Sequence, residues 1–263
     1  MMEAYFGLRR MPFDRDIKST DLIASFDSRE AEARLNHVKQ YRGIMCLTGE
    51  PGSGKTSIVR KWVDDLNPQS FLHCYTPHVT VSRSELYRQT NSLLNLPMKS
   101  RKSDLYRQIQ AAIWHQYTHG KVTVLVLDEC QLMDHASLQE LVLLTNFEMD
   151  SSLPFILLLI GQPEFKDILS RSIHEPLRQR INLRYHMSGL SLDETKVYVE
   201  GHLRLVGRVD PLFDDGAFAV LHQLSSGLPR KINKLCLAAM QLVMSERRKL
   251  ITPDDILKVA TEQ

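Results

Sequence analysis

The strongest chemical signal in the sequence is a loop rich in glycine, Gly49-Glu50-Pro51-Gly52-Ser53-Gly54-Lys55-Thr56, which is a complete GxxxxGK[ST] motif. Its glycines let backbone N–H groups turn toward a phosphate chain, and the N-terminus of a following helix adds a favourable dipole. Lys55 is expected to neutralise the β- and γ-phosphates of ATP, and Thr56 to coordinate Mg²⁺. The expected ATP ligands here are Gly49, Glu50, Pro51, Gly52, Ser53, Gly54, Lys55, Thr56 and Ser57.

An acidic pair supplies the second half of the expected site. Asp128 and Glu129 directly follow the apolar run Val122–Leu127, and ligands of parallel sheets bind at the carboxyl ends of the strands. We expect Asp128 to hold Mg²⁺ and Glu129 to act as the base that polarises the attacking water.

Three further polar residues follow apolar strands or precede them. Gln162 follows the run Phe155–Ile160, where it is expected beside the γ-phosphate; the alternative is an ordinary turn residue. Arg178 and Arg180 come just before the fifth predicted strand, where an arginine can reach the nucleotide of a neighbouring subunit. The alternative for both arginines is a solvated surface loop.

The elements that must position these residues alternate between strands and helices. Apolar runs predict five strands, at Ile44–Thr48, Phe71–Tyr75, Val122–Leu127, Phe155–Ile160 and Leu183–Met187. Helical stretches separate them, which predicts a three-layer α/β core with a five-stranded parallel sheet. Only helical patterns follow, so we predict a core over residues 1–189, including an N-terminal segment and first helix over 1–43, and a small all-α lid domain over 190–263.

Composition excludes several classes of protein. The 33 Lys and Arg residues nearly balance 31 Asp and Glu residues, for a net charge of +2, which excludes a polycation or an acidic tail. The four cysteines form no CxxC pair, so we expect buried, reduced thiols. The sequence contains neither a run of about 20 apolar residues nor a leader pattern, and we expect a cytoplasmic chain without a membrane anchor of its own.

With these motifs in view, the chain resembles an AAA+ ATPase of the ExeA/GspA-like group, which is close to the transposition ATPases of the TnsC, MuB and IstB types. The resemblance rests on the two phosphate-site motifs, on Arg178-Gln-Arg-Ile181, and on two further segments. Tyr5-Phe-Gly-Leu-Arg-Arg-Met-Pro-Phe13 matches an "FGL…PF" pattern, and Gly227-Leu-Pro-Arg-Lys-Ile-Asn233 matches "GxPRxIN".

The resemblance implies several properties of this chain. The N-terminal segment is expected near the adenine, Arg230 is expected to contact ATP from the lid, and subunits are expected to assemble as an ATP-dependent, hexamer-like ring or filament. ExeA-type secretion ATPases carry a transmembrane helix and a periplasmic region after this module. The chain ends at Gln263 without them, which at this point favours a free-standing transposition ATPase.

Charge placement agrees with that expectation. Between residues 78 and 120 six cations face two anions, whereas the whole chain carries only +2. Arg83, Lys99, Arg101 and Lys102 are therefore candidate contacts to double-stranded DNA, with a solvated loop as the alternative.

Three functions remain open on the sequence. The first is an ATP-dependent DNA-binding ATPase that selects targets for a partner transposase. The alternative is an ExeA/GspA-like ATPase that assists type II secretion or pilus assembly through a membrane partner. The third is a slowly hydrolysing signalling switch, against which the intact Glu129 argues.

Overall fold

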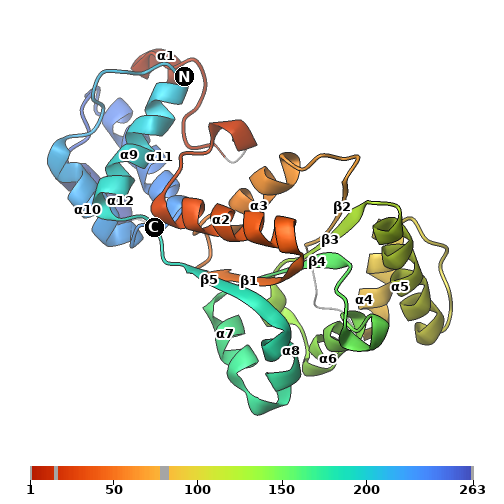
Figure 1. Ribbon diagram of the computed structural model, residues 1–263. Helices are drawn as coiled ribbons and strands as arrows, with labels where there is room; N and C mark the ends of the chain where they lie inside the picture. Colours follow the sequence, from red (N-terminus) through yellow and green to blue (C-terminus); the bar gives the residue numbers. More distant parts are fainter. Residues whose placement is uncertain (1, 15–16, 78–82, 262–263) are drawn as a thin grey trace. The chain divides into compact units, whose positions relative to one another are not determined.

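The computed structural model describes residues 2–14, 17–77 and 83–261, and these residues form two compact units (Figure 1). One unit comprises Glu30–Gly49 and Lys55–Met187, and it contains the sheet. The other comprises Met1–Arg29, Glu50–Gly54 and Ser188–Gln263.

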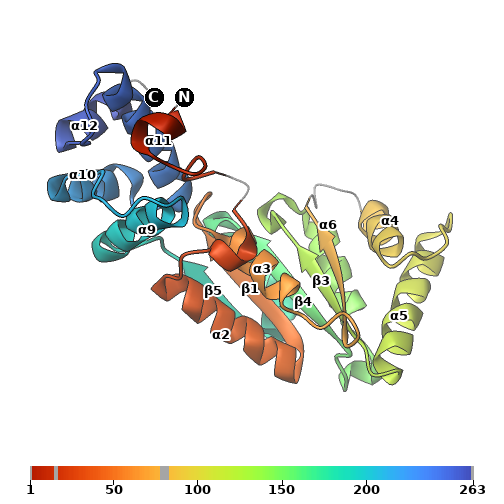
Figure 2. The same cartoon turned by 90° about the horizontal axis from the view of Figure 1, so that it is seen from above.

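The sheet of the first unit is parallel throughout, and its strands lie in the order β2-β3-β4-β1-β5 (Figure 2). The strands are β1 (Gly43–Gly49), β2 (Phe71–Thr76), β3 (Val122–Leu127), β4 (Phe155–Gly161) and β5 (Ile181–Met187). Strands β1 and β4 are buried at every residue, as expected for central strands covered on both faces. This confirms the predicted five-stranded parallel α/β core.

Helices cover both faces of the sheet. They are α2 (Phe26–Tyr41), α3 (Lys55–Asp64), α4 (Arg83–Leu93), α5 (Lys102–Thr118), α6 (His135–Leu144), α7 (Pro163–Ser170) and α8 (Glu175–Arg180). Helices α2 and α3 pack on one face through residues such as Leu35 and Trp62, and they lie above the strands in Figure 1. Helices α4 to α8 pack on the other face through residues such as Ile109 and Phe165. The sheet is therefore the middle of three layers.

One local expectation differs from the structure. Arg178 and Arg180 lie in helix α8, where a loop was expected, because Leu177 is buried in the core and fixes a short helix with Pro176 in its first turn. Helix α6 ends at Leu144 and a short 3₁₀ turn, Glu148–Asp150, follows it.

The second unit is helical. Its helices are α1 (Met2–Phe6), α9 (Leu192–Leu205), α10 (Asp215–Ser225), α11 (Pro229–Ser245) and α12 (Pro253–Thr261), with no strand in its described residues. Helix α9 begins with a complete capping box, in which Ser191 and Glu194 each bind the backbone of the other. The glycine of the "GxPRxIN" segment has a structural reason: Gly227 has a φ of +70°, and a Cβ there would lie 2.0 Å from the carbonyl oxygen of Leu190.

The N-terminal segment up to Arg29 groups with these helices, whereas the sequence pattern predicts residues 1–43 as part of the core. Phe6, Leu8 and Phe13 are buried in the same apolar cluster as α9, α10 and α11. The hydroxyl of Tyr5 also donates to the carbonyl of Arg248 at 2.9 Å. The segment is placed there because its apolar side chains complete the helical core, which is a long-range effect.

Replacing Phe6 with alanine should therefore destabilise the helical unit. Phe6 is 2% exposed, and removing a buried phenyl ring typically costs about 3–5 kcal/mol. Amide hydrogen exchange should accelerate in α9 and α11 of Phe6→Ala. The matched control is Phe26→Ala, because Phe26 is 60% exposed and should be nearly neutral. Unchanged protection in Phe6→Ala would contradict this placement.

Candidate functional site

The phosphate-binding loop joins the end of β1 to the start of α3. Lys55, the first residue of α3, is 8% exposed, and its Nζ donates to the carbonyl of Gly49 at 2.7 Å. Gly52 and Gly54 have φ angles of +86° and +100°, which glycine adopts readily. The Ser53 hydroxyl is buried without a hydrogen-bond partner. A buried, unsatisfied hydroxyl in such a loop fits the oxygen of a bound phosphate.

Asp128 connects three segments. It lies directly after β3, is 5% exposed, and its Oδ2 accepts hydrogen bonds from the Thr56 hydroxyl at 2.9 Å and the Tyr75 hydroxyl at 3.0 Å. Its Oδ1 accepts the backbone N–H of Glu129 at 2.8 Å. Burial and the nearby negative charge of Asp128 raise the pKa of Tyr75, so this phenol stays a donor. The structure thus brings Thr56 and Asp128 together, while sequence reasoning missed Tyr75.

Glu129 occupies a left-handed backbone conformation, with φ 56° and ψ 40°. For a residue with a side chain this conformation costs on the order of 1–3 kcal/mol, and such strain is often found at functional sites. It turns the chain into a 3₁₀ turn, Cys130–Leu132. Cys130 anchors the turn, because it is fully buried and its Sγ donates to the carbonyl of Leu127 at 3.2 Å. All four cysteines are free and buried, as expected.

Two glutamine side chains converge on the Glu129 carboxylate. Its Oε2 accepts from Nε2 of Gln131 at 2.6 Å and from Nε2 of Gln162 at 3.2 Å. Gln162 stands at the N-cap of α7, directly after β4. The structure thus brings Gln162 and Glu129 together at neighbouring strand ends, and the expected place of Gln162 beside the γ-phosphate stays a prediction. Gln131 was not predicted, and its position two residues after Glu129 was the only available signal.

The two candidate arginine fingers form ion pairs outside this cluster. Arg178 pairs with Glu175, one helical turn earlier in α8. Arg180 binds both oxygens of Asp150, the second contact at 2.9 Å. Their side chains are 35% and 24% exposed.

Arg230 lies against the phosphate-binding loop, within the unit that contains both. Its backbone N–H donates to the carbonyl of Gly52 at 3.3 Å. A Cβ on Gly52 would lie 2.5 Å from the Cβ of Arg230, so this contact requires glycine. The contact keeps Arg230 among the candidate phosphate ligands.

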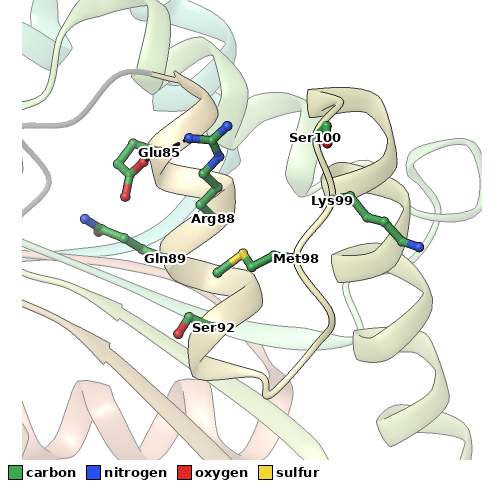
Figure 3. A pocket seen from close by; sticks show the side chains of 7 residues that line it. All are labelled: Glu85, Arg88, Gln89, Ser92, Met98, Lys99 and Ser100. Atoms are coloured by element: carbon green, nitrogen blue, oxygen red, sulfur yellow. Dashed lines mark ion pairs between the residues drawn. The ribbon is translucent and has the colours of Figure 1, made fainter.

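Of the four expected DNA contacts, three are exposed and the fourth, Lys102, is partly buried. Arg83, Lys99 and Arg101 are exposed, and Lys99 lies on a loop beside α4 that borders a groove with Arg88 and Met98 (Figure 3). In that view the Lys99 side chain extends away from α4.

Lys102 forms an ion pair with the buried carboxylate of Glu140. Glu140 also accepts from the Tyr87 hydroxyl at 2.7 Å. This ion pair competes with a contact to DNA, because a buried carboxylate must retain its partners, but the Lys102 side chain is 40% exposed and its DNA contact stays a prediction.

The residues present fit a magnesium–nucleotide complex. Among the residues that the structure describes, no group of three or more His, Cys, Asp or Glu side chains could hold a metal ion. Mg²⁺ suits a site of this kind, because it commonly binds through one or two protein oxygens together with substrate phosphates and water. The Thr56 hydroxyl and the Asp128 carboxylate, already in contact, supply such oxygens.

Comparison with known proteins agrees with this geometry. The family described as "AAA domain" matches residues 38–169. General secretion pathway protein A of Aeromonas hydrophila is 32% identical over 265 residues, covering 100% of this chain and 48% of that protein. The chain thus spans about half the length of this curated relative. Within the described residues, no helix has the length and apolar character needed to cross a bilayer.

Solved structures show the same fold. Cdc6p from Pyrobaculum aerophilum superposes with a TM-score of 0.71 at 16% identity, over 95% of this chain and 70% of that one. The Aeropyrum pernix ORC1 protein, solved in complex with DNA, has a TM-score of 0.68 at 14% identity, over 95% and 68% of the two chains. The parallel sheet, the phosphate-binding loop and the match over residues 38–169 together show that the chain belongs to the AAA domain family of P-loop nucleotide-binding proteins.

Proposed function

We propose that this chain hydrolyses ATP to ADP and phosphate in a magnesium-dependent reaction. The observation that carries the proposal is a pair of hydrogen bonds to Asp128, one from the Thr56 hydroxyl and one from the Glu129 backbone N–H. They join a candidate metal site to a candidate base. A purely structural nucleotide site has no need for a carboxylate held in a strained turn beside it.

Each residue has a distinct role in this proposal. Lys55 binds the β- and γ-phosphates, and Thr56 and Asp128 hold Mg²⁺, which neutralises phosphate charge when bound. Glu129 orients a water molecule and accepts its proton as that water attacks the γ-phosphorus. Gln162 holds the carboxylate of Glu129 from the neighbouring strand end.

We further propose that this ATPase acts in protein secretion. The 32% identity to general secretion pathway protein A extends over the whole of this chain, and it favours a role in secretion over the transposition function expected from the sequence. In this proposal the partners are components of a secretion apparatus, and ATP binding promotes self-assembly.

DNA binding remains a second candidate, favoured by one observation. Arg83, Lys99 and Arg101 are exposed in one sequence region with a local surplus of positive charge. Such cations bind phosphates without sequence preference and with strong salt dependence. Because Lys102 forms an ion pair with Glu140, it adds less positive charge to this region than the sequence suggests, and this weakens the DNA-binding candidate.

Lys55→Ala and Glu129→Gln should separate nucleotide binding from turnover. Lys55→Ala removes the cation that contacts phosphates in the ground state, so ATP binding should be lost. Glu129→Gln should bind ATP and lose about 100- to 10,000-fold in hydrolysis rate, as expected for a removed general base. ATP titration and phosphate release measure the two effects. Normal turnover in Glu129→Gln would exclude the proposed role of that residue.

Arg180 is expected to complete the site of a neighbouring subunit, with Arg178 as the alternative. Arg180→Ala should lose roughly 10³–10⁵-fold in rate if it acts as a finger. Mixing Arg180→Ala with Lys55→Ala, each inactive alone, should restore part of the turnover through shared interfaces. The control is Arg171→Ala, because Arg171 is an exposed arginine just before α8. Failure of complementation at every mixing ratio would argue against action between subunits.

The two cellular functions predict different results for a charge reversal. Lys99→Glu combined with Arg101→Glu should abolish ATP-dependent DNA binding if DNA is the partner. Under the secretion proposal, wild-type protein should not bind duplex DNA with ATP at moderate salt. Deleting the gene should then reduce export of proteins to the medium, and wild-type but not Glu129→Gln protein should restore it.

The matched control for charge is Lys166→Glu with Arg171→Glu, two exposed cations of the α7 region. Tight, ATP-dependent DNA binding that is lost only in the Lys99 and Arg101 variant would reject the secretion proposal in favour of the second candidate.

A further inference from the structure

We propose that Gln131 is a positioning residue for ATP hydrolysis, which holds the Glu129 carboxylate in its working orientation. This inference rests on the proposed ATPase function. Gln131 does not itself contact the reacting atoms in this proposal. It acts through Glu129, whose Oε2 accepts its Nε2 at 2.6 Å.

Both ends of the Gln131 amide are used. While its Nε2 donates to Glu129, its Oε1 accepts the backbone N–H of Gln162 at 3.0 Å. A side-chain amide supplies a donor and an acceptor from two different atoms of one planar group, and the two contacts together define which atom is oxygen. The side chain therefore bridges the residues that follow β3 and β4.

The bridge closes a small network. The side chain of Gln162 donates to the same Oε2 of Glu129 at 3.2 Å. Gln131 thus binds the backbone N–H of Gln162, and the side chains of Gln131 and Gln162 both bind the Glu129 carboxylate. A carboxylate held by two amide donors from two strand ends has little rotational freedom, and catalytic bases depend on such orientation.

The backbone explains why Gln131 can reach Glu129. The left-handed conformation of Glu129 begins the 3₁₀ turn, in which the N–H of Leu132 donates to the carbonyl of Glu129 at 2.9 Å. Cys130, between Glu129 and Gln131, is fully buried, whereas both neighbours are only partly buried. Burial of Cys130 thus holds the turn that brings the two polar side chains together.

The first test compares Gln131→Ala with the wild-type protein. We expect kcat for ATP hydrolysis to fall about 10- to 100-fold, the range that a small misplacement of a catalytic group produces. The KM and the ATP dissociation constant should change less than about twofold, because the phosphate ligands are intact. The control is Gln110→Ala. Gln110 lies in α5 and donates to the carbonyl of Asn146 at 2.9 Å in an exposed hydrogen bond, so kcat of this variant should not change.

Gln131→Glu separates the two ends of the amide. It retains an acceptor for the Gln162 N–H but removes the donor to Glu129 and places a second carboxylate against it. Its kcat should fall at least as far as that of Gln131→Ala. Recovery of wild-type kcat in Gln131→Glu would show that only the bond to Gln162 matters, and would overturn the positioning role.

A double-mutant cycle distinguishes positioning from a general structural role. In a Glu129→Gln background, Gln131→Ala should cause no further loss in single-turnover hydrolysis, because its effect passes through the missing carboxylate. Fully additive losses, an unchanged kcat in Gln131→Ala, or lost ATP binding would each overturn the proposal.

If wild-type protein itself shows no magnesium-dependent hydrolysis, the proposed ATPase function is wrong, and the proposed role of Gln131 is wrong as well. If wild-type protein hydrolyses ATP and Gln131→Ala has the same kcat, only the positioning role of Gln131 is rejected.

Discussion

The buried carboxylate of Asp128 is the constraint on which the candidate site depends. Its two oxygens accept hydrogen bonds from the start of α3, the end of β2 and the backbone of Glu129. A buried carboxylate is costly unless it is paired or hydrogen-bonded, so these three segments must meet there. The central sheet makes this meeting possible, because the parallel strands β2 and β3 end at the same edge.

Strain and burial are coupled in the turn after β3. Glu129 adopts a conformation that is unfavourable for a residue with a side chain, and the buried Cys130 helps to maintain it. The result is a carboxylate that directly follows β3 and is bound by Gln131 and Gln162. The packing of a small apolar residue thus positions the group proposed to do the chemistry.

The comparisons change the biological setting without changing the proposed chemistry. Local positive charge between residues 78 and 120 is the sequence feature that favours a DNA partner. The 32% identity to general secretion pathway protein A extends over the whole of this chain and 48% of that protein, and it is the ground for the proposed role in secretion. The ion pair between Lys102 and Glu140 also shows that charge counted along a sequence overstates the charge available to a partner.

The sequence alone determined the parallel core, the phosphate-binding loop and the pair Asp128–Glu129, because these are encoded in short patterns: apolar runs, glycine spacing, and polar residues directly after a strand. Only the tertiary structure decided that Phe6 belongs to the helical unit and that Gln131 bridges two strand ends. These contacts depend on which distant segments share a core or a sheet edge. One sequence carries no periodicity from which such long-range pairings can be read.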